Sequence, residues 1–261
     1  MIPSKIEYDF ISNALQELQD KECSKSIIKL FRTGVGKKAG RTITRNLSYF
    51  QNSLLILTGT AGALGPELKP GDIFIPNMIR SVAPAKELFT FNVLSLPCVL
   101  SFITGTMITI STLTDQQKYN RHKHTKTQSV RTDTCVRPQN HKAIMNEEPY
   151  QNEKKLLHQH YNASAVDMES FILLKICREY HLNMLIVKVI LDAYNESIGR
   201  EKKEFFLFPE DGGNDFSEEK RKLFIERLET SSRQLAQIIH SICIQQGNML
   251  ESYDYEVSKD A

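Results

Sequence analysis

The sequence lacks an excess of charge of either sign, a long apolar run and a recognisable cysteine pattern. Its 33 basic and 31 acidic residues give a formal net charge of +2, which provides no global basic field for nucleic acid. No apolar run reaches the roughly 18 residues of a membrane span, and the start has no signal-peptide core. The five cysteines are odd in number and widely spaced, without metal-ligand spacing. We expect a cytoplasmic protein without a metal.

The 261 residues suffice for one large α/β domain. Residues 53–57 and 184–190 are continuous apolar runs, as in strands buried on both faces of a parallel sheet. Between them, residues 169–181 have apolar side chains at helical spacing after an acidic start. The order strand, helix, strand predicts a wound α/β fold with helices on the sheet.

A long helix is predicted to begin near Asp215, because Asp215 and Glu218 have the spacing of a capping box. It should pack on the sheet as the last element. We therefore place one domain at 1–245 and a polar, poorly ordered tail at 246–261. Residues 116–148 are strongly basic and read as an exposed insertion; a phosphate or RNA contact is the alternative, although no aromatic residues interleave to stack bases.

Charged residues stand where the sequence otherwise predicts buried structure. Lys188 interrupts an apolar strand and needs an anionic partner or ligand. Asp192 follows at the carboxyl end of that strand, where open α/β sheets bind ligands. Asp167 and Glu169 come just before an apolar helix, so each could be there only because the helix dipole stabilises a negative charge at this end. Asp192 could likewise be only a cap or turn residue.

Two glycine-rich segments could bring backbone N–H groups close to an anion or another ligand. One contains Gly34, Gly36 and Lys37, and the other contains Thr60 and Gly62; each follows a possible strand. Neither has the spacing of a dinucleotide-binding or nucleoside triphosphate-binding loop. We therefore expect no nucleotide cofactor.

Three motifs occur in a recognisable order. They are TGVGK at 33–37, LTGTAGALGPELKPGDI at 57–73, and AVDMES at 165–170 together with KVILD at 188–192. Together they resemble the 5'-methylthioadenosine/S-adenosylhomocysteine nucleosidases and related nucleoside phosphorylases. The resemblance implies a single α/β domain with a mixed central sheet flanked by helices. It also implies cleavage of the N-glycosidic bond of an adenosine-type purine nucleoside, without a cofactor.

The resemblance assigns roles residue by residue. Asp192 matches the general acid that protonates the purine N7, for which it would have to carry or share a proton. Glu169 matches the residue that accepts hydrogen bonds from the ribose hydroxyls, and Met168 the residue packed on the sugar face. Thr60, in the same segment as Gly62, matches a residue near the nucleophile. Lys188 stands where many members have arginine. Lysine keeps the positive charge but lacks the planar guanidinium group that forms paired hydrogen bonds.

The N-terminus departs from the family pattern, in which an apolar strand ends in an acidic segment that activates the attacking water. Here that strand is reduced to a stub. Glu7 aligns with the base, and residues 9–19 should form the helix that follows.

Alternatives remain open. Phosphate could replace water as nucleophile; Leu57 stands where many phosphorylases have arginine, although Arg32, Lys37 or a neighbouring subunit could compensate. The chain could also be a catalytically weak nucleoside-binding homologue. The basic insertion replaces the region where relatives contact the base. Leu113 or its neighbours could line that pocket, although the alignment there is poor. A weaker likeness to hopanoid-associated nucleoside phosphorylases lies at 208–215, beside aromatic candidates for the 5' group, Phe205, Phe206 and Phe208. The resemblance also implies a homodimer.

Overall fold

The computed structural model describes residues 1–20, 28–82, 88–90, 101–110, 148–196 and 218–246. Its helices are α1 (Lys5–Gln19), α2 (Lys37–Arg45), the 3₁₀ helix η1 (Leu47–Tyr49), α4 (Glu148–Tyr161), α5 (Ser170–Glu179) and α7 (Glu218–Gln246). Its strands are β1 (Leu55–Ala63), β2 (Ile73–Ser81), β3 (Leu88–Thr90), β4 (Ile103–Thr109), β5 (Ala165–Asp167) and β6 (Met184–Asp192). The predicted α/β class with a mixed sheet is confirmed.

The six strands form one sheet in the order β3-β2-β4-β5-β1-β6, and β2 also pairs with β6. This last pairing joins the two sides, so that β2, β4, β5, β1 and β6 make a closed ring. The apolar runs in β1 and β6 are parallel strands, as predicted, and the two strands pair directly with each other. β5 runs antiparallel to β1 and parallel to β4. The short β5, which ends at Asp167, therefore lies between β1 and β4.

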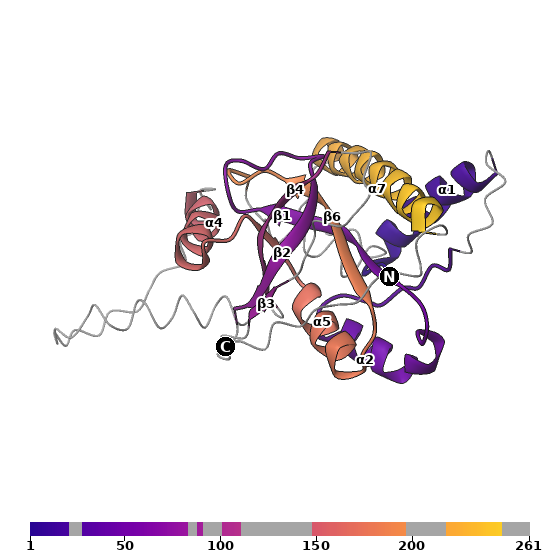
Figure 1. The fold of residues 1–261 in the computed structure, drawn as a ribbon. Helices are drawn as coiled ribbons and strands as arrows, with labels where there is room; N and C mark the ends of the chain where they lie inside the picture. Colours follow the sequence, from indigo (N-terminus) through magenta and orange to yellow (C-terminus); the bar gives the residue numbers. More distant parts are fainter. Residues whose placement is uncertain (21–27, 83–87, 91–100, 111–147, 197–217, 247–261) are drawn as a thin grey trace, which may run out of the picture.

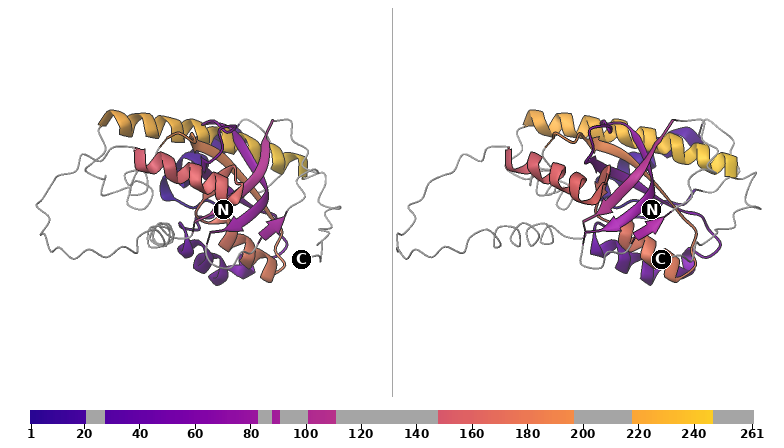
Figure 2. Two further views of the ribbon diagram at one scale, coloured as in Figure 1. Left: turned by 90° about the vertical axis from the view of Figure 1, so that its left-hand side faces the viewer. Right: turned by 60° about the vertical axis from the view of Figure 1, so that its left-hand side comes forward.

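Helices cover the sheet on two sides (Figure 1). α1 and α7 pack together on one side, where α7 contacts β6 and β1, as predicted for the last helix. α2 and α5 pack together on the other. The views in Figure 2 show α7 and α5 on opposite sides of the strands. Leu157 of α4 packs in a separate cluster with Leu64 and Ile108, near the ends of β1 and β4.

The first helix begins earlier than the sequence suggested. α1 starts at Lys5 rather than near residue 9, because Ser4 and Glu7 form a capping box in which each side chain bonds the backbone of the other. The stub before it makes only an isolated parallel bridge between Ile2 and Arg32. Glu7 therefore lies in the first turn of a helix, which fixes its carboxylate more firmly than a loop would.

The glycine-rich segment after the first apolar run is also different from the prediction. Residues 58–62 continue β1 rather than following it as a loop, and the strand ends at Ala63. The pairing with β6 continues through this segment, with a register shift between Ala61 and Gly62. The segment at 34–36 likewise follows no strand, and Gly36 is instead the N-cap residue of α2. The glycines at 59 and 62 thus belong to a β-strand, and Gly36 belongs to the N-terminus of a helix.

Some predictions concern residues outside the described ranges. They are the start of the last helix at Asp215, the basic insertion apart from residue 148, which begins α4, and the tail apart from Gln246, which ends α7. The boundary at 245 and 246 stays a prediction. Among the residues that the structure describes, no helix is both long and apolar enough to cross a membrane.

Candidate active site

Four charged side chains from different elements come together in the interior of the protein. Glu7 comes from α1, Asp167 from the end of β5, Glu169 from the start of α5 and Lys188 from β6. All four are buried, and Lys188 is fully inaccessible to solvent. Such a cluster is costly unless its members neutralise one another or a ligand. Three of these residues were predicted as site residues, whereas Asp167 was quoted only as part of the motif.

Glu7 is held by hydrogen bonds on both carboxylate oxygens. Its Oε1 accepts from the backbone N and from Oγ1 of Thr60, each at 2.8 Å. Its Oε2 accepts from Oγ of Ser4 at 2.6 Å. The structure thus brings the predicted base and Thr60 into direct contact, although they are 53 residues apart in the sequence.

Lys188 has the anionic partners that the sequence required. Its Nζ lies 3.1 Å from Oδ2 of Asp167 and 3.9 Å from Oε2 of Glu169. Burial is the largest influence and lowers the pKa of Lys188, but the carboxylates of Asp167, Glu169 and Glu7 together raise the pKa above its ordinary value. The ammonium therefore stays charged at neutral pH and compensates the surrounding acids.

Asp167 has a structural role that its neighbours could have revealed. It accepts hydrogen bonds from Oγ1 of Thr109 at 2.7 Å and from the backbone N of Ser170 at 3.1 Å, and the Ser170 hydroxyl also bonds it. An aspartate three residues before a helix-starting serine commonly makes such bonds. Asp167 thus caps α5 and anchors Lys188, with its oxygens already engaged.

Glu169 is free of the capping role that the sequence left open. It is the N-cap residue of α5, yet its side chain makes no capping bond. Its Oε1 instead accepts from the backbone N of Gly36 at 3.1 Å, across 133 residues of sequence. Burial raises the pKa of Glu169 to about 8, against the opposing effect of Lys188 and with help from Asp167 and Glu7. A carboxyl with this pKa changes charge readily near neutral pH.

Asp192 lies at the end of β6, as predicted, and is buried. Its Oδ2 forms an ion pair with Nζ of Lys154, which comes from α4 and is 1% exposed. The same Nζ donates to the backbone oxygen of Ala193 at 2.6 Å. The sequence reasoning missed Lys154, because a lysine in a polar helix gives no sign of being buried.

Two glycines of β1 let the carboxylates approach the strand. At Gly62, an added Cβ would lie 3.1 Å from Oδ2 of Asp192. At Gly59, it would lie 3.1 Å from Oε1 of Glu7, and the φ of +143° is one that favours glycine. Thr60 and Gly62 are two residues apart, a separation of roughly 6.6 Å along a strand. Glu7 and Asp192 therefore both lie against β1, at Thr60 and at Gly62.

The remaining predicted residues are less engaged. Met168 is half-buried between Asp167 and Glu169. The backbone oxygen of Gly34 accepts a bond from the hydroxyl of Thr33. The side chain of Lys37 lies outside the described part of the structure, as do Leu113, Phe205, Phe206 and Phe208. Within the described ranges, no group of three or more histidine, cysteine or acidic residues is arranged to hold a metal ion.

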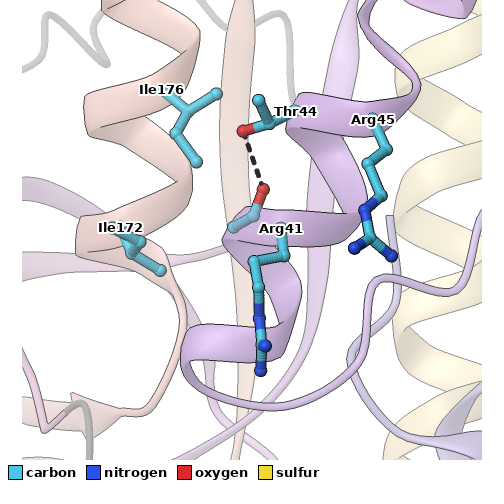
Figure 3. A pocket seen from close by; sticks show the side chains of 6 residues that line it. Arg41, Thr44, Arg45, Ile172 and Ile176 are labelled. Carbon is cyan, nitrogen blue, oxygen red and sulfur yellow. Dashed lines mark hydrogen bonds between the residues drawn. The ribbon is translucent and has the colours of Figure 1, made fainter.

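A groove of about 450 Å³ lies away from these carboxylates, between α2 and α5. Figure 3 shows Ile172 and Ile176 of α5 beside α2, where Thr44 faces α5 and the side chains of Arg41 and Arg45 extend downward in this view. Its lining residues are Gly40, Arg41, Thr44, Arg45, Ile172 and Ile176. None of them is a predicted site residue, so the groove is a separate surface feature.

Comparisons with known proteins identify the family of the chain. A family model described as the phosphorylase superfamily matches residues 22–241. The 5'-methylthioadenosine/S-adenosylhomocysteine nucleosidase of Buchnera aphidicola subsp. Baizongia pistaciae is 27% identical over 174 residues. That alignment covers 64% of this chain and 62% of the relative, so the chain spans less than two thirds of its length.

Solved structures show the same fold. The nucleosidase of that name from Campylobacter jejuni has a TM-score of 0.58 at 15% identity, with 94% of this chain and 97% of that chain covered. The futalosine hydrolase of Helicobacter pylori has a TM-score of 0.55 at 14% identity, with 92% and 94% covered. These likenesses extend over almost the whole of each chain.

Proposed function

Because the chain belongs to the phosphorylase superfamily, we propose that it is a nucleosidase, which hydrolyses the N-glycosidic bond of an adenosine-type purine nucleoside. Methylthioadenosine and adenosylhomocysteine are the substrates named for the Buchnera relative. The products would be the free base and the free sugar.

One observation carries the choice of water as nucleophile. The carboxylate of Glu7 takes up both the backbone N–H and the hydroxyl of Thr60, the donors nearest the proposed nucleophile site. A carboxylate there can accept a proton from water, whereas it would repel phosphate. The Gly36 N–H, which could otherwise help to hold an anion, already bonds Glu169. These occupied donors favour hydrolysis.

The proposed mechanism divides the work between the two ends of the site. Cleavage of this bond develops positive charge on the ribosyl ring, which nearby carboxylates stabilise. Asp192 protonates the purine N7, so that the base leaves neutral. Glu7 removes a proton from water as the water attacks the anomeric carbon. Each proton transfer typically contributes about 10²- to 10⁴-fold to the rate.

Other residues would hold the ribose between these two groups. Glu169 accepts hydrogen bonds from the sugar hydroxyls, and its position is set by Gly36 and Lys188. Met168 packs on the sugar face. Gly62 gives the substrate and Asp192 room beside β1. Lys188 acts at a distance, by fixing Glu169 and balancing the charge of the cluster.

The experiment measures free base released from methylthioadenosine, adenosylhomocysteine and adenosine, each with and without phosphate. We expect release that ignores phosphate, with free sugar as the co-product, and a loss of about 10²- to 10⁴-fold for Glu7→Gln and Asp192→Asn. Glu179→Gln, on the exposed end of α5, is the matched control.

Other results would replace the proposal with a defined alternative. Release that requires phosphate and yields a sugar phosphate would make the protein a phosphorylase. Binding of a nucleoside without any turnover would make it a catalytically weak homologue. Unchanged turnover in Asp192→Asn would refute the assignment of the general acid.

We further propose that two copies of the chain form a homodimer through the face that carries α2 and α5. The groove there has an apolar floor of Ile172 and Ile176, and Tyr49 beside α2 is 77% exposed. Large exposed apolar groups next to a groove are typical of association surfaces. Sedimentation of the wild type and of Tyr49→Asp tests this; a wild-type monomer would contradict it.

A cytoplasmic location is proposed on the basis of the cysteines. Cys177, a buried cysteine within the described ranges, is a free thiol, and burial raises the pKa of Cys177 to about 12. Such thiols are typical of a reducing compartment. Cell fractionation tests the location, and recovery from an oxidising compartment would contradict it.

A further inference from the structure

Lys154 is a buried lysine that the proposed mechanism does not use. Its ammonium pairs with Oδ2 of Asp192 and donates to the backbone oxygen of Ala193 at 2.6 Å. Both acceptors belong to the end of β6, so a residue of α4 is directed at the proposed general acid. Side-chain exposures of 1% for Lys154 and 10% for Asp192 place the pair away from bulk water.

The position of Lys154 is fixed by the packing of α4. Leu157, one helical turn further along, is buried against Leu64, Ile108 and Val166. Residues three apart share a helix face, so this apolar contact and the ammonium point to the same side of α4. Opposite the pair, β1 presents Gly62, which has no side chain. Lys154 is therefore the charged group that the described structure sets against Asp192.

The ion pair conflicts with simple acid catalysis by Asp192. A neighbouring cation favours the ionised form of a carboxyl group, whereas an acid must hold a proton. A lysine can resolve the conflict, because a buried ammonium can release its proton to a partner, which a guanidinium does not do. The pair then changes from two charges to two neutral groups.

We propose that Lys154 is a positioning residue of the glycosidic cleavage, which orients Asp192 and supplies the proton that Asp192 passes to the purine N7. This inference rests on the proposed nucleosidase function. A proton moves from Lys154 to Asp192 and from Asp192 to N7, while the electrons of the C–N bond move onto the base. Lys154 is left as a neutral amine. Glu7 takes one proton from the attacking water, and exchange with solvent returns Glu7 and Lys154 to their starting states.

Three variants of α4 test the proposal by turnover of the active nucleoside. Lys154→Met removes the charge, Lys154→Arg keeps it but cannot release a proton, and Lys155→Met changes the exposed neighbour as the control. We expect kcat to fall by about 10²-fold or more in both Lys154 variants, with a smaller change in KM. The control should match the wild type. Wild-type kcat in Lys154→Arg would overturn the proposal, because it would show that charge alone suffices.

A substrate whose leaving group needs no acid separates proton supply from damage to the fold. 4-Nitrophenyl riboside releases a stable phenolate, so both Lys154 variants and Asp192→Asn should retain its hydrolysis if the proposal holds. An equal loss on this substrate and on the nucleoside would overturn it. A wild-type protein that cleaves no nucleoside would instead refute the proposed function.

Discussion

Two buried lysines serve the site in different ways. Lys188 lies in the middle of β6 and faces Asp167 and Glu169 at 3.1 and 3.9 Å. Lys154 lies on α4 and faces Asp192 and one backbone oxygen. The first lysine compensates acids from β5, α5 and α1, whereas the second joins a separate helix to Asp192. The same residue type thus supports a permanent charge in one place and a transferable proton in the other.

The surroundings of each lysine explain the difference. The carboxylates near Lys188 raise the pKa of its ammonium, so its proton is held tightly. Asp167 in turn is fixed by Thr109 and Ser170. Asp192 has Gly62 beside it, where β1 offers no side chain. The cluster around Lys188 is therefore suited to rigidity, and the pair with Lys154 to exchange with a ligand.

The largest effect should follow removal of the Lys188 charge. Lys188→Met leaves buried carboxylates without their cation and should lower the free energy of unfolding by about 3–5 kcal/mol. Lys154→Met should cost less, because the side chain of Asp192, at 10% exposure, is closer to solvent than those of Asp167 and Glu169, at 1% and 6%. Urea unfolding measures both, and Lys175→Met, on the exposed side of α5, is the control. Equal losses in the two variants would break the comparison.

The next effect concerns the pH dependence of stability. The pKa of Glu169 is about 8 in the folded protein against an ordinary 4.5, so between these values the folded state keeps a proton that the unfolded state has released. Stability due to this group therefore falls as pH rises from about 4.5 to about 8. Each pKa unit corresponds to about 1.4 kcal/mol, which sets the scale.

Glu169→Gln removes this titration and should flatten the stability curve across that range. Relative to the wild type, the variant should gain stability as pH rises from 5 to 8, whatever it loses from the missing contact with Lys188. Denaturant midpoints at several pH values measure this, with Glu179→Gln as the control on the same helix. Parallel curves for the variant and the wild type would contradict the assignment.

The difference between the two lysines also explains what the sequence could predict. Lys188 interrupts a run of apolar strand residues, which makes a buried charge visible. Asp192 follows from its position at the strand end. Lys154 stands among polar residues of α4, between Glu153 and Lys155, and reads as exposed. Only the tertiary contact of that helix with the ends of the strands buries it.

The N-terminal sequence contains a local signal for the start of α1. Ser4 and Glu7 have the spacing of a capping box, which would have placed the start of α1 at Lys5. The contact between Glu7 and Thr60 could not be predicted in this way, because it depends on how α1 packs against β1. Local rules thus locate elements, while contacts between distant segments require the fold.

A smaller effect should come from the coupling between Lys154 and Asp192. In a double-mutant cycle with Lys154→Met and Asp192→Asn, the pair should show a coupling of about 0.5–3 kcal/mol in the free energy of unfolding. Asp192→Asn alone leaves the ammonium without its counter-charge, and the double variant removes that penalty. Urea unfolding of the four proteins gives the value. Additive losses would mean that the ion pair contributes nothing to stability.

The smallest effect on stability should accompany Gly62→Ala, which adds one methyl group beside Asp192. The new Cβ would lie 3.1 and 3.3 Å from the two carboxylate oxygens, which must then shift. Alanine also lowers the conformational entropy of the unfolded chain. This stabilises the folded state by about 0.4–1 kcal/mol and offsets part of the cost of the crowding. Stability should thus stay nearly constant while kcat falls by about tenfold, since small displacements of a catalytic group are costly.

Gly105→Ala is the matched control for this change. Gly105 lies on β4, and an added Cβ would lie 3.0 Å from the hydroxyl oxygen of Ser164, with no contact to Asp192. Kinetics and urea unfolding of both variants separate the two effects. If Gly62→Ala lost stability but kept kcat, Asp192 would tolerate displacement, and its exact placement by Lys154 could not matter for catalysis. If kcat alone fell, the acid would depend on its position, as a proton path through Lys154 requires.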